Sequence, residues 1–409
     1  MQRINEEYQL DRVELLFLSF YLVIMTVELS VEYYSGMGIG WALMLFRGLS
    51  ILTPLFAIEL MLKHPMQSNT YRSTVCIYFL FLLAWSLIAY ILQQNANVSL
   101  FSATIYFAIP LGVSLGVVNA EAFKKSFCII CLIGIACFFF VWFMYDIDIS
   151  KALRRYYTWS NIFFWAGVFW AIIPVILYCV IFNCSKIYKT VAITYWMCGV
   201  VFNLIFLKRF IIVDSILILI MICVFLLCEG KINIRSFLYA LLLVGIAVLV
   251  VHFASDSAIG SLWKGVIGRF DDTTMTEFDR FEEARIYFSN TKPIYVILGR
   301  GLWGAHSSFG VLNEALHVGW CNWIHKGGIV LFLFAFIPSI KAFILLPKMK
   351  ELDSKTKWAV CMACIYAGRL FYSNMHAHYP EMVMVFFSYA VIMNYKLPTG
   401  YSRKSRYLK

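Results

Sequence analysis

The chain has 409 residues, of which 62% are hydrophobic and only 14% are charged. A soluble globular protein is about 45–50% apolar and about 25% charged, so this chain has too few polar residues to cover its surface in water. Its net charge of +11 does not indicate a nucleic-acid partner, because the basic residues lie in short segments between apolar runs, where they set membrane topology. The composition therefore predicts a polytopic membrane protein.

About twelve apolar runs follow one another along the chain, each near the ~20 residues that a helix needs to cross a bilayer. They cover residues 14–33, 39–62, 74–93, 101–118, 126–145, 160–183, 188–207, 209–228, 236–254, 324–346, 357–373 and 380–396. We therefore expect an all-α polytopic fold with about twelve transmembrane helices and one long loop that contains short helices. Residues 1–254 would hold nine helices, 255–318 the loop, and 319–409 three helices and a basic tail.

The segments between the runs alternate in charge. With the N-terminus inside, each short inner segment carries Lys or Arg, whereas the outer segments 34–38, 94–100 and 374–379 carry neither. Positive charge is retained on the cytoplasmic side of a membrane. The alternation predicts an even number of helices and both termini in the cytoplasm.

Two short basic segments break this alternation on the outer side. Arg154 and Arg155 follow one apolar run, and Lys208 and Arg209 form the turn between two others. Since such residues oppose the topological preference, another cause must retain them, and we expect them to bind an anion. The simpler interpretation of Arg209 is a helix-end cation whose stem lies along lipid.

The long loop has three parts that bear on chemistry. Residues 277–289 form an acidic and basic stretch, 298–304 form a glycine-rich turn, and His317 stands where the chain re-enters the membrane. Glycines allow a backbone to approach a phosphate closely, although an ordinary flexible turn would also explain them. A histidine can transfer protons near neutral pH, although a single histidine is more often structural.

If residues 277–289 are helical, Arg280, Glu283 and Arg285 lie within about one and a half turns of each other. Together with Arg300 they could bind an anion and position an acid or base. The alternative is that both helical arginines pair with neighbouring carboxylates on a solvated surface.

Asp214 lies inside an apolar run, and an ionisable residue there indicates function by default. The alternative is a buried partner of Arg209 or Arg47. Arg369 also lies within an apolar run, and we expect it to face the outer side and close the site.

The pattern of the long loop resembles the O-antigen polymerase/ligase superfamily, which includes Wzy-type polymerases and WaaL-type ligases. In that superfamily a periplasmic loop carries a proline and paired glycines, then a histidine opening a helix, then a Gly-Ile pair. The matching residues here are Pro293, Gly299, Gly301, His317, Gly328 and Ile329.

The resemblance implies a GT-C-like fold in the bacterial inner membrane and transfer of a glycan from an undecaprenyl-diphosphate-linked oligosaccharide at the periplasmic face. It leaves open a chain-length regulator protein as a further partner. We expect arginines to neutralise the diphosphate in place of a metal, with no cofactor. The candidate catalytic residues are His317, Arg285, Arg280 and Glu283. The candidate diphosphate-binding residues are Arg209, Lys208, Arg300, Arg154 and Arg155.

Three functions compete on this basis. A polymerase would join repeat units on the lipid carrier, and a ligase would move finished glycan to lipid A-core. The asparagine that commonly follows the histidine in ligases is Val318 here, which favours the polymerase. A flippase or transporter of lipid-linked oligosaccharide is the alternative of another class, but the chain shows no internal repeat of the kind that transporters carry.

Overall fold

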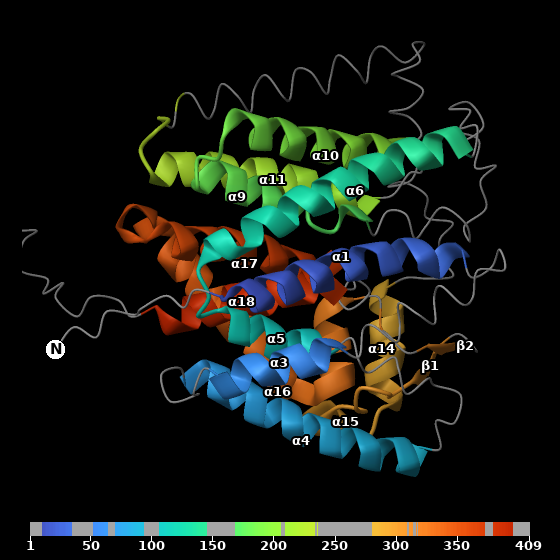
Figure 1. Cartoon of the computed structure of the whole chain (residues 1–409). Helices are drawn as coiled ribbons and strands as arrows, with labels where there is room; N and C mark the ends of the chain where they lie inside the picture. Colours follow the sequence, from blue (N-terminus) through green and yellow to red (C-terminus); the bar gives the residue numbers. More distant parts are fainter. Residues whose placement is uncertain are drawn as a thin grey trace, which may run out of the picture.

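The computed structural model describes residues 10–34, 52–63, 70–93, 106–144, 168–205, 209–233, 235, 280–308, 311–313, 316, 318–372 and 379–395. This part of the chain is mostly helical (Figure 1). The α-helices are α1 (Arg12–Tyr34), α3 (Leu52–Lys63), α4 (Thr70–Gln93), α5 (Ala108–Leu115), α6 (Phe123–Met144), α9 (Ile172–Ile181), α10 (Lys186–Ile205), α11 (Arg209–Cys228), α14 (Arg280–Asn290), α15 (Pro293–Leu298), α16 (Gly319–Leu345), α17 (Ser354–Tyr372) and α18 (Tyr379–Asn394).

Short elements complete the described fold. The 3₁₀ helices η4 (Ala120–Ala122) and η7 (Leu346–Glu351) adjoin α6 and α16. Strands β1 (His306–Ser308) and β2 (Val311–Asn313) form a small antiparallel pair in which His306 faces Asn313. The long helices lie side by side, and α14 lies across one end of them, close to the strands (Figure 1).

Three of the described helical segments, 70–92, 120–140 and 319–351, are long and apolar enough to cross a membrane. Large apolar side chains on α4 and α16 are exposed, as lipid-facing side chains are, and include Ile77, Leu80, Ile88, Ile91, Ile329, Leu333, Ile337 and Phe343. The predicted helical, membrane-associated class is confirmed. The number of spans stays a prediction, and the apolar run 236–254 lies outside the described residues.

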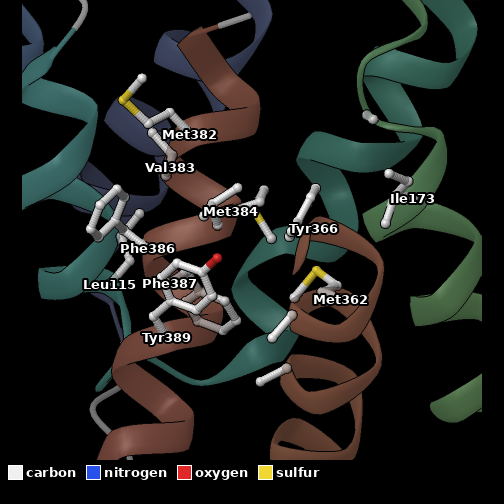
Figure 2. Packing of buried hydrophobic residues seen from close by; sticks show 14 of the residues in the cluster. Leu115, Ile173, Met362, Tyr366, Met382, Val383, Met384, Phe386, Phe387 and Tyr389 are labelled. Carbon is white, nitrogen blue, oxygen red and sulfur yellow. The ribbon is translucent and has the colours of Figure 1, made fainter. Parts of the chain in front are cut away.

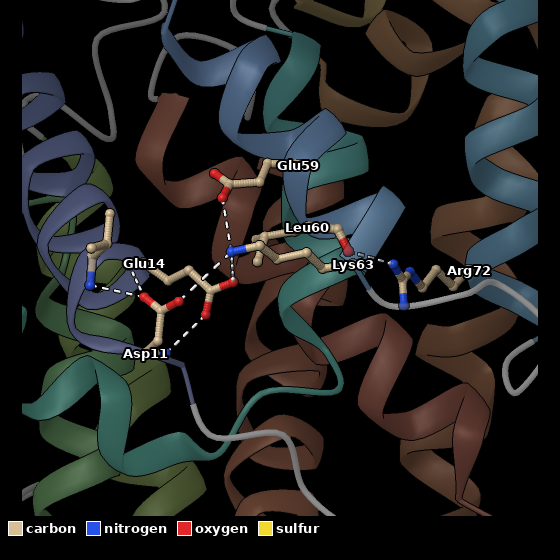
Figure 3. Close-up of polar contacts among 7 residues, drawn as sticks. Asp11, Glu14, Glu59, Leu60, Lys63 and Arg72 are labelled. Atoms are coloured by element: carbon tan, nitrogen blue, oxygen red, sulfur yellow. Dashed lines mark hydrogen bonds and ion pairs between the residues drawn. The ribbon is translucent and has the colours of Figure 1, made fainter.

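The first helix begins at a capping box (Figure 3). Asp11 Oδ1 accepts hydrogen bonds from the amides of Val13 and Glu14 at 2.8 and 2.9 Å, and Glu14 Oε2 accepts from the Asp11 amide at 2.9 Å. The Glu14 amide holds the pKa of Asp11 below its usual range. Lys63 at the end of α3 pairs with Glu14 at 3.1 Å and with Glu59 at 2.9 Å, so it joins α3 to the start of α1.

The core lies where α5, α9, α17 and α18 meet (Figure 2). Trp358 is fully buried, and its indole N–H donates to the Pro174 carbonyl at 3.0 Å. Helices α5 and α18 can approach closely because Gly112 has no Cβ. A Cβ there would lie 2.5 Å from the Val383 carbonyl oxygen. Small residues at helix contacts allow such backbone approach in membranes, where packing rather than water exclusion holds helices together.

Candidate functional site

Helix α16 is interrupted at Gly328, which has φ 67° and ψ −172°. This backbone region is essentially restricted to glycine. A Cβ at Gly328 would also lie 2.0 Å from the Ile297 carbonyl oxygen. The last carbonyls before the break have no partner in the next helical turn, so other groups must satisfy them.

The glycine turn, defined here as residues 298–305, satisfies those carbonyls. The Arg300 amide donates to the His325 carbonyl at 2.7 Å, and the Gly301 amide donates to the Lys326 carbonyl at 3.1 Å. Tyr78 of α4 donates its hydroxyl to the Gly327 carbonyl. The expectation that the turn offers its backbone to a phosphate is wrong for these two amides, because they bind the broken helix instead.

Helix α4 holds the other side of the glycine turn. Trp85 donates its indole N–H to the Gly299 carbonyl at 2.9 Å, and the Leu302 amide donates to Ser86 Oγ at 2.9 Å. Gly301, with φ 84°, lies so close that a Cβ there would be 2.8 Å from Ser86 Cα. The turn is therefore a buried structural piece that fills the space between α4 and α16.

Two ionisable residues of α16 face the glycine turn, and the sequence analysis did not select either. Lys326 is 2% exposed, and its Nζ donates to the carbonyls of Leu302 and Gly304 at 3.1 and 2.9 Å. His325 is fully buried, and its Nε2 lies 3.1 Å from the same Gly304 carbonyl. The signal was available, since a His-Lys pair at the start of an apolar run is costly to bury unless it has a role.

Arg300 is the predicted anion-binding residue that the structure places at this site. The residue is half-buried, and its Nη1 donates to the Ala305 carbonyl at 3.3 Å. The guanidinium carbon lies 5.9 Å from the ring centre of Tyr287 and 5.3 Å from that of Tyr295. Two segments thus contribute to this site: the glycine turn carries Arg300, and α16 carries His325 and Lys326, whose side chains contact that turn.

Helix α14 confirms the predicted helical stretch from Arg280 onward and places Glu283 and Arg285 on different faces. Arg285 is exposed and donates Nε to Glu282 Oε2 at 2.6 Å, with a second contact between the same side chains. That hydrogen bond holds the pKa of Glu282 below its usual value and raises the pKa of Arg285. The simpler interpretation of Arg285, a solvated ion pair, therefore describes this structure.

Glu283 faces the opposite way and is 1% exposed. It lies on the face of α14 that also carries Ala284 and Tyr287, which pack with Leu316, Val318 and Cys321. The Tyr287 ring meets the His325 ring edge-on at 5.1 Å. Of the two predicted catalytic residues whose side chains are described, Glu283 and Arg285, it is thus Glu283 whose helix face turns toward the broken helix.

Several predicted residues are not described. His317, Lys208, Arg154 and Arg155 lie outside the described residues, and Arg280 and Arg209 begin α14 and α11 with side chains that are not described. Asn322 lies one turn into α16. Its Oδ1 accepts from the Leu316 amide at 3.2 Å, so it holds the backbone next to that histidine.

A second buried ionic cluster lies at the ends of α11, α17 and α18. Arg369 is 2% exposed; its Nε lies 3.4 Å from Asp214 Oδ1, and its Nη1 pairs with Glu381. The expectation that Asp214 pairs with Arg209 or Arg47 did not include this partner. Arg369 lies on a different helix 155 positions away by the residue numbers, so no local pattern indicates the pairing.

Within the described residues, no three His, Cys, Asp or Glu side chains come together as metal ligands. No model of a known protein family matches the chain, and no curated protein is significantly similar to it in sequence. The case for a function therefore rests on the residues of this chain.

Proposed function

We propose that the protein is a multi-pass membrane glycosyltransferase of the O-antigen polymerase type. It would join undecaprenyl-diphosphate-linked oligosaccharide repeat units at the periplasmic face of the bacterial inner membrane. In this proposal the chain crosses the membrane about twelve times with both termini in the cytoplasm, and the site between α14, the glycine turn and α16 faces the periplasm.

The observation that carries the proposal is the gathering of Arg300, His325 and Lys326 at a break in an apolar helix. Ionisable groups are expensive inside a membrane protein and usually mark the path or site of a polar substrate. Non-helical backbone at membrane depth is tolerated where it is buried in protein or lines a cavity. This arrangement supports a site for a charged headgroup that is attached to a lipid.

The proposed reaction places clear demands on these side chains. The bond between the sugar anomeric carbon and the diphosphate oxygen breaks, an acceptor hydroxyl oxygen bonds to that carbon, and the hydroxyl proton passes to a base. The lipid diphosphate leaves with the bonding electron pair and so gains one negative charge beyond those it carries in the donor. Fixed arginines stabilise such charge through paired hydrogen bonds.

Roles follow for the residues of this chain. Arg300 would bind the diphosphate, with Arg280 and Arg285 on α14 as further cations. Arg285 would have to exchange its contact with Glu282 for the substrate. Lys208, Arg209, Arg154 and Arg155 are proposed as additional diphosphate ligands. His317 is the proposed base, with Glu283 as its substitute.

Purified protein in nanodiscs, supplied with lipid-linked oligosaccharide from the source organism, tests the proposal. A ladder of chain lengths, formed without ATP and with chelator present, is expected. A single shift of glycan onto added lipid A-core would instead indicate a ligase. Movement of the lipid-linked oligosaccharide across the bilayer, with no new glycosidic bond, would indicate a flippase.

The Arg300→Ala variant tests the site itself, with Lys348→Ala as the matched control. Lys348 is an exposed cation on η7, beyond the other end of α16. Loss of Arg300 should reduce the rate of transfer about tenfold or more, because the free energy of one hydrogen bond to a charged group corresponds to a change of about that size. Equal ladders from both variants would contradict the proposed role of Arg300.

A further inference from the structure

We propose that Lys326 is a positioning residue that fixes the guanidinium group of Arg300 by holding the glycine turn. Because Arg300 is taken as a ligand of the donor diphosphate, this inference rests on the function proposed above. Lys326 itself does not contact the donor in this proposal.

The burial of Lys326 calls for a specific explanation. The residue is 2% exposed, and it lies within a helix that is long and apolar enough to cross a membrane. Burying an ammonium group is costly unless well-placed partners compensate. Those partners include the carbonyls of Leu302 and Gly304, and the ring of Tyr106 lies 5.9 Å from Nζ. The charge is thus directed at the backbone of one particular turn.

Residues 325 and 326 hold the glycine turn by backbone and side chain at once. Their carbonyls accept the amides of Arg300 and Gly301, while both side chains reach the Gly304 carbonyl. A carbonyl only accepts, so His325 Nε2 carries a hydrogen there. The turn is consequently attached at its beginning and at its end, and the two ends cannot move independently.

The attachment at the end of the turn determines where Arg300 points. Arg300 Nη1 donates to the carbonyl of Ala305, the residue directly after Gly304. Without Lys326 the Gly304 carbonyl would keep its contact with His325 but lose its charged donor, so the Gly304–Ala305 peptide could shift and carry that acceptor away. The guanidinium group would then keep its tyrosine neighbours, Tyr287 and Tyr295, but lose its hydrogen bond to the Ala305 carbonyl.

The same helix provides a matched control. Lys341 is half-buried, and its Nζ donates to two carbonyls, those of Met393 and Tyr395, at 3.1 and 2.9 Å. It lies roughly 20 Å further along the helix axis than Lys326. Replacing either lysine by methionine removes the same kind of contact, but only Lys326 contacts the glycine turn.

The experiment compares Lys326→Met, Lys341→Met, Arg300→Ala and the Lys326→Met/Arg300→Ala double variant in the nanodisc transfer assay. We expect Lys326→Met to raise the KM for the lipid-linked donor about tenfold, the size of one hydrogen bond to a charged group, with a smaller change in kcat. Lys341→Met should keep the wild-type KM. In the Arg300→Ala background, loss of Lys326 should have no further effect, because it acts through Arg300.

Three results would overturn the inference. One is an unchanged KM in Lys326→Met, and another is an effect of Lys326→Met that adds fully to that of Arg300→Ala. The third is failure of both Lys326→Met and Lys326→Gln to accumulate as folded protein while Lys341→Met does, which would make Lys326 purely structural. A wild-type protein that transfers no glycan would instead refute the proposed function, so the two failures are distinct.

Discussion

Replacing Gly328 by alanine should separate the two parts of α16 from the glycine turn. Gly328 has a backbone conformation that only glycine adopts readily, and an added Cβ would lie 2.0 Å from the Ile297 carbonyl oxygen and 2.4 Å from its carbonyl carbon. Both of these atoms belong to backbone, so no side-chain rotation relieves the contact. Either the helix break or the turn must shift.

The expected cost follows from these contacts. A non-glycine residue in this backbone region costs about 1–3 kcal/mol. A shift of the turn would also weaken the hydrogen bonds from the Arg300 and Gly301 amides to the carbonyls before the break, at about 1 kcal/mol each. We therefore expect Gly328→Ala to lower the free energy of unfolding by about 3–5 kcal/mol, a large part of the total for a typical protein.

Thermal unfolding of purified protein in one detergent, followed by the monomer peak in size-exclusion chromatography, measures this change. Gly368→Ala is the control, because a Cβ at Gly368 would first meet Leu217 Cδ1 at 3.6 Å, an ordinary contact. That control should keep or raise the Tm, since alanine favours a helix over glycine by about 1 kcal/mol. A Gly328→Ala protein with the Tm of the wild type would refute the reasoning.

Two further perturbations concern charged pairs. The Glu282–Arg285 pair lowers the Glu282 pKa, so its stabilisation of α14 is present above the ordinary value of 4.5 and is lost as the pH falls through the lowered value. Hydrogen exchange of α14 should show this acid loosening in the wild type and not in Glu282→Gln. Arg369→Met should destabilise the protein by about 3–5 kcal/mol, because Asp214 and Glu381 would stay buried without this partner. Adding Asp214→Asn and Glu381→Gln should recover part of the Tm, and no recovery would argue against the ionic cluster.

The positions of several helices could be predicted closely from apolar runs, whereas the run 101–118 contains only the short helix α5 within the described residues. The predicted run 209–228 coincides with α11, and the runs 74–93 and 357–373 lie within a few residues of α4 and α17. The reason is physical, because a lipid environment requires each spanning segment to satisfy its own backbone, which only a helix does within one segment.

The candidate site was predicted in part. A helical stretch was expected at 277–289 and is described from Arg280 onward, and the family resemblance selected Gly299, Gly301 and Gly328 without giving the reason for these glycines. The glycines have no Cβ, so the backbone of the glycine turn can lie directly against the backbone of its neighbours in α4 and α16. The charge pattern likewise identified Arg285. It did not show that the Arg285 side chain lies on the exposed face of α14, where it pairs with Glu282.

The sequence by itself determined the helical, membrane-associated class of this protein, because hydropathy is a property of each segment alone. Only the tertiary structure decided that Lys326 binds the glycine turn and that Arg369 binds Asp214. These partners come from segments that are distant in the chain and are brought together by helix packing. A charged residue within an apolar run indicates that a partner is needed, but the packing of the helices determines which residue that partner is.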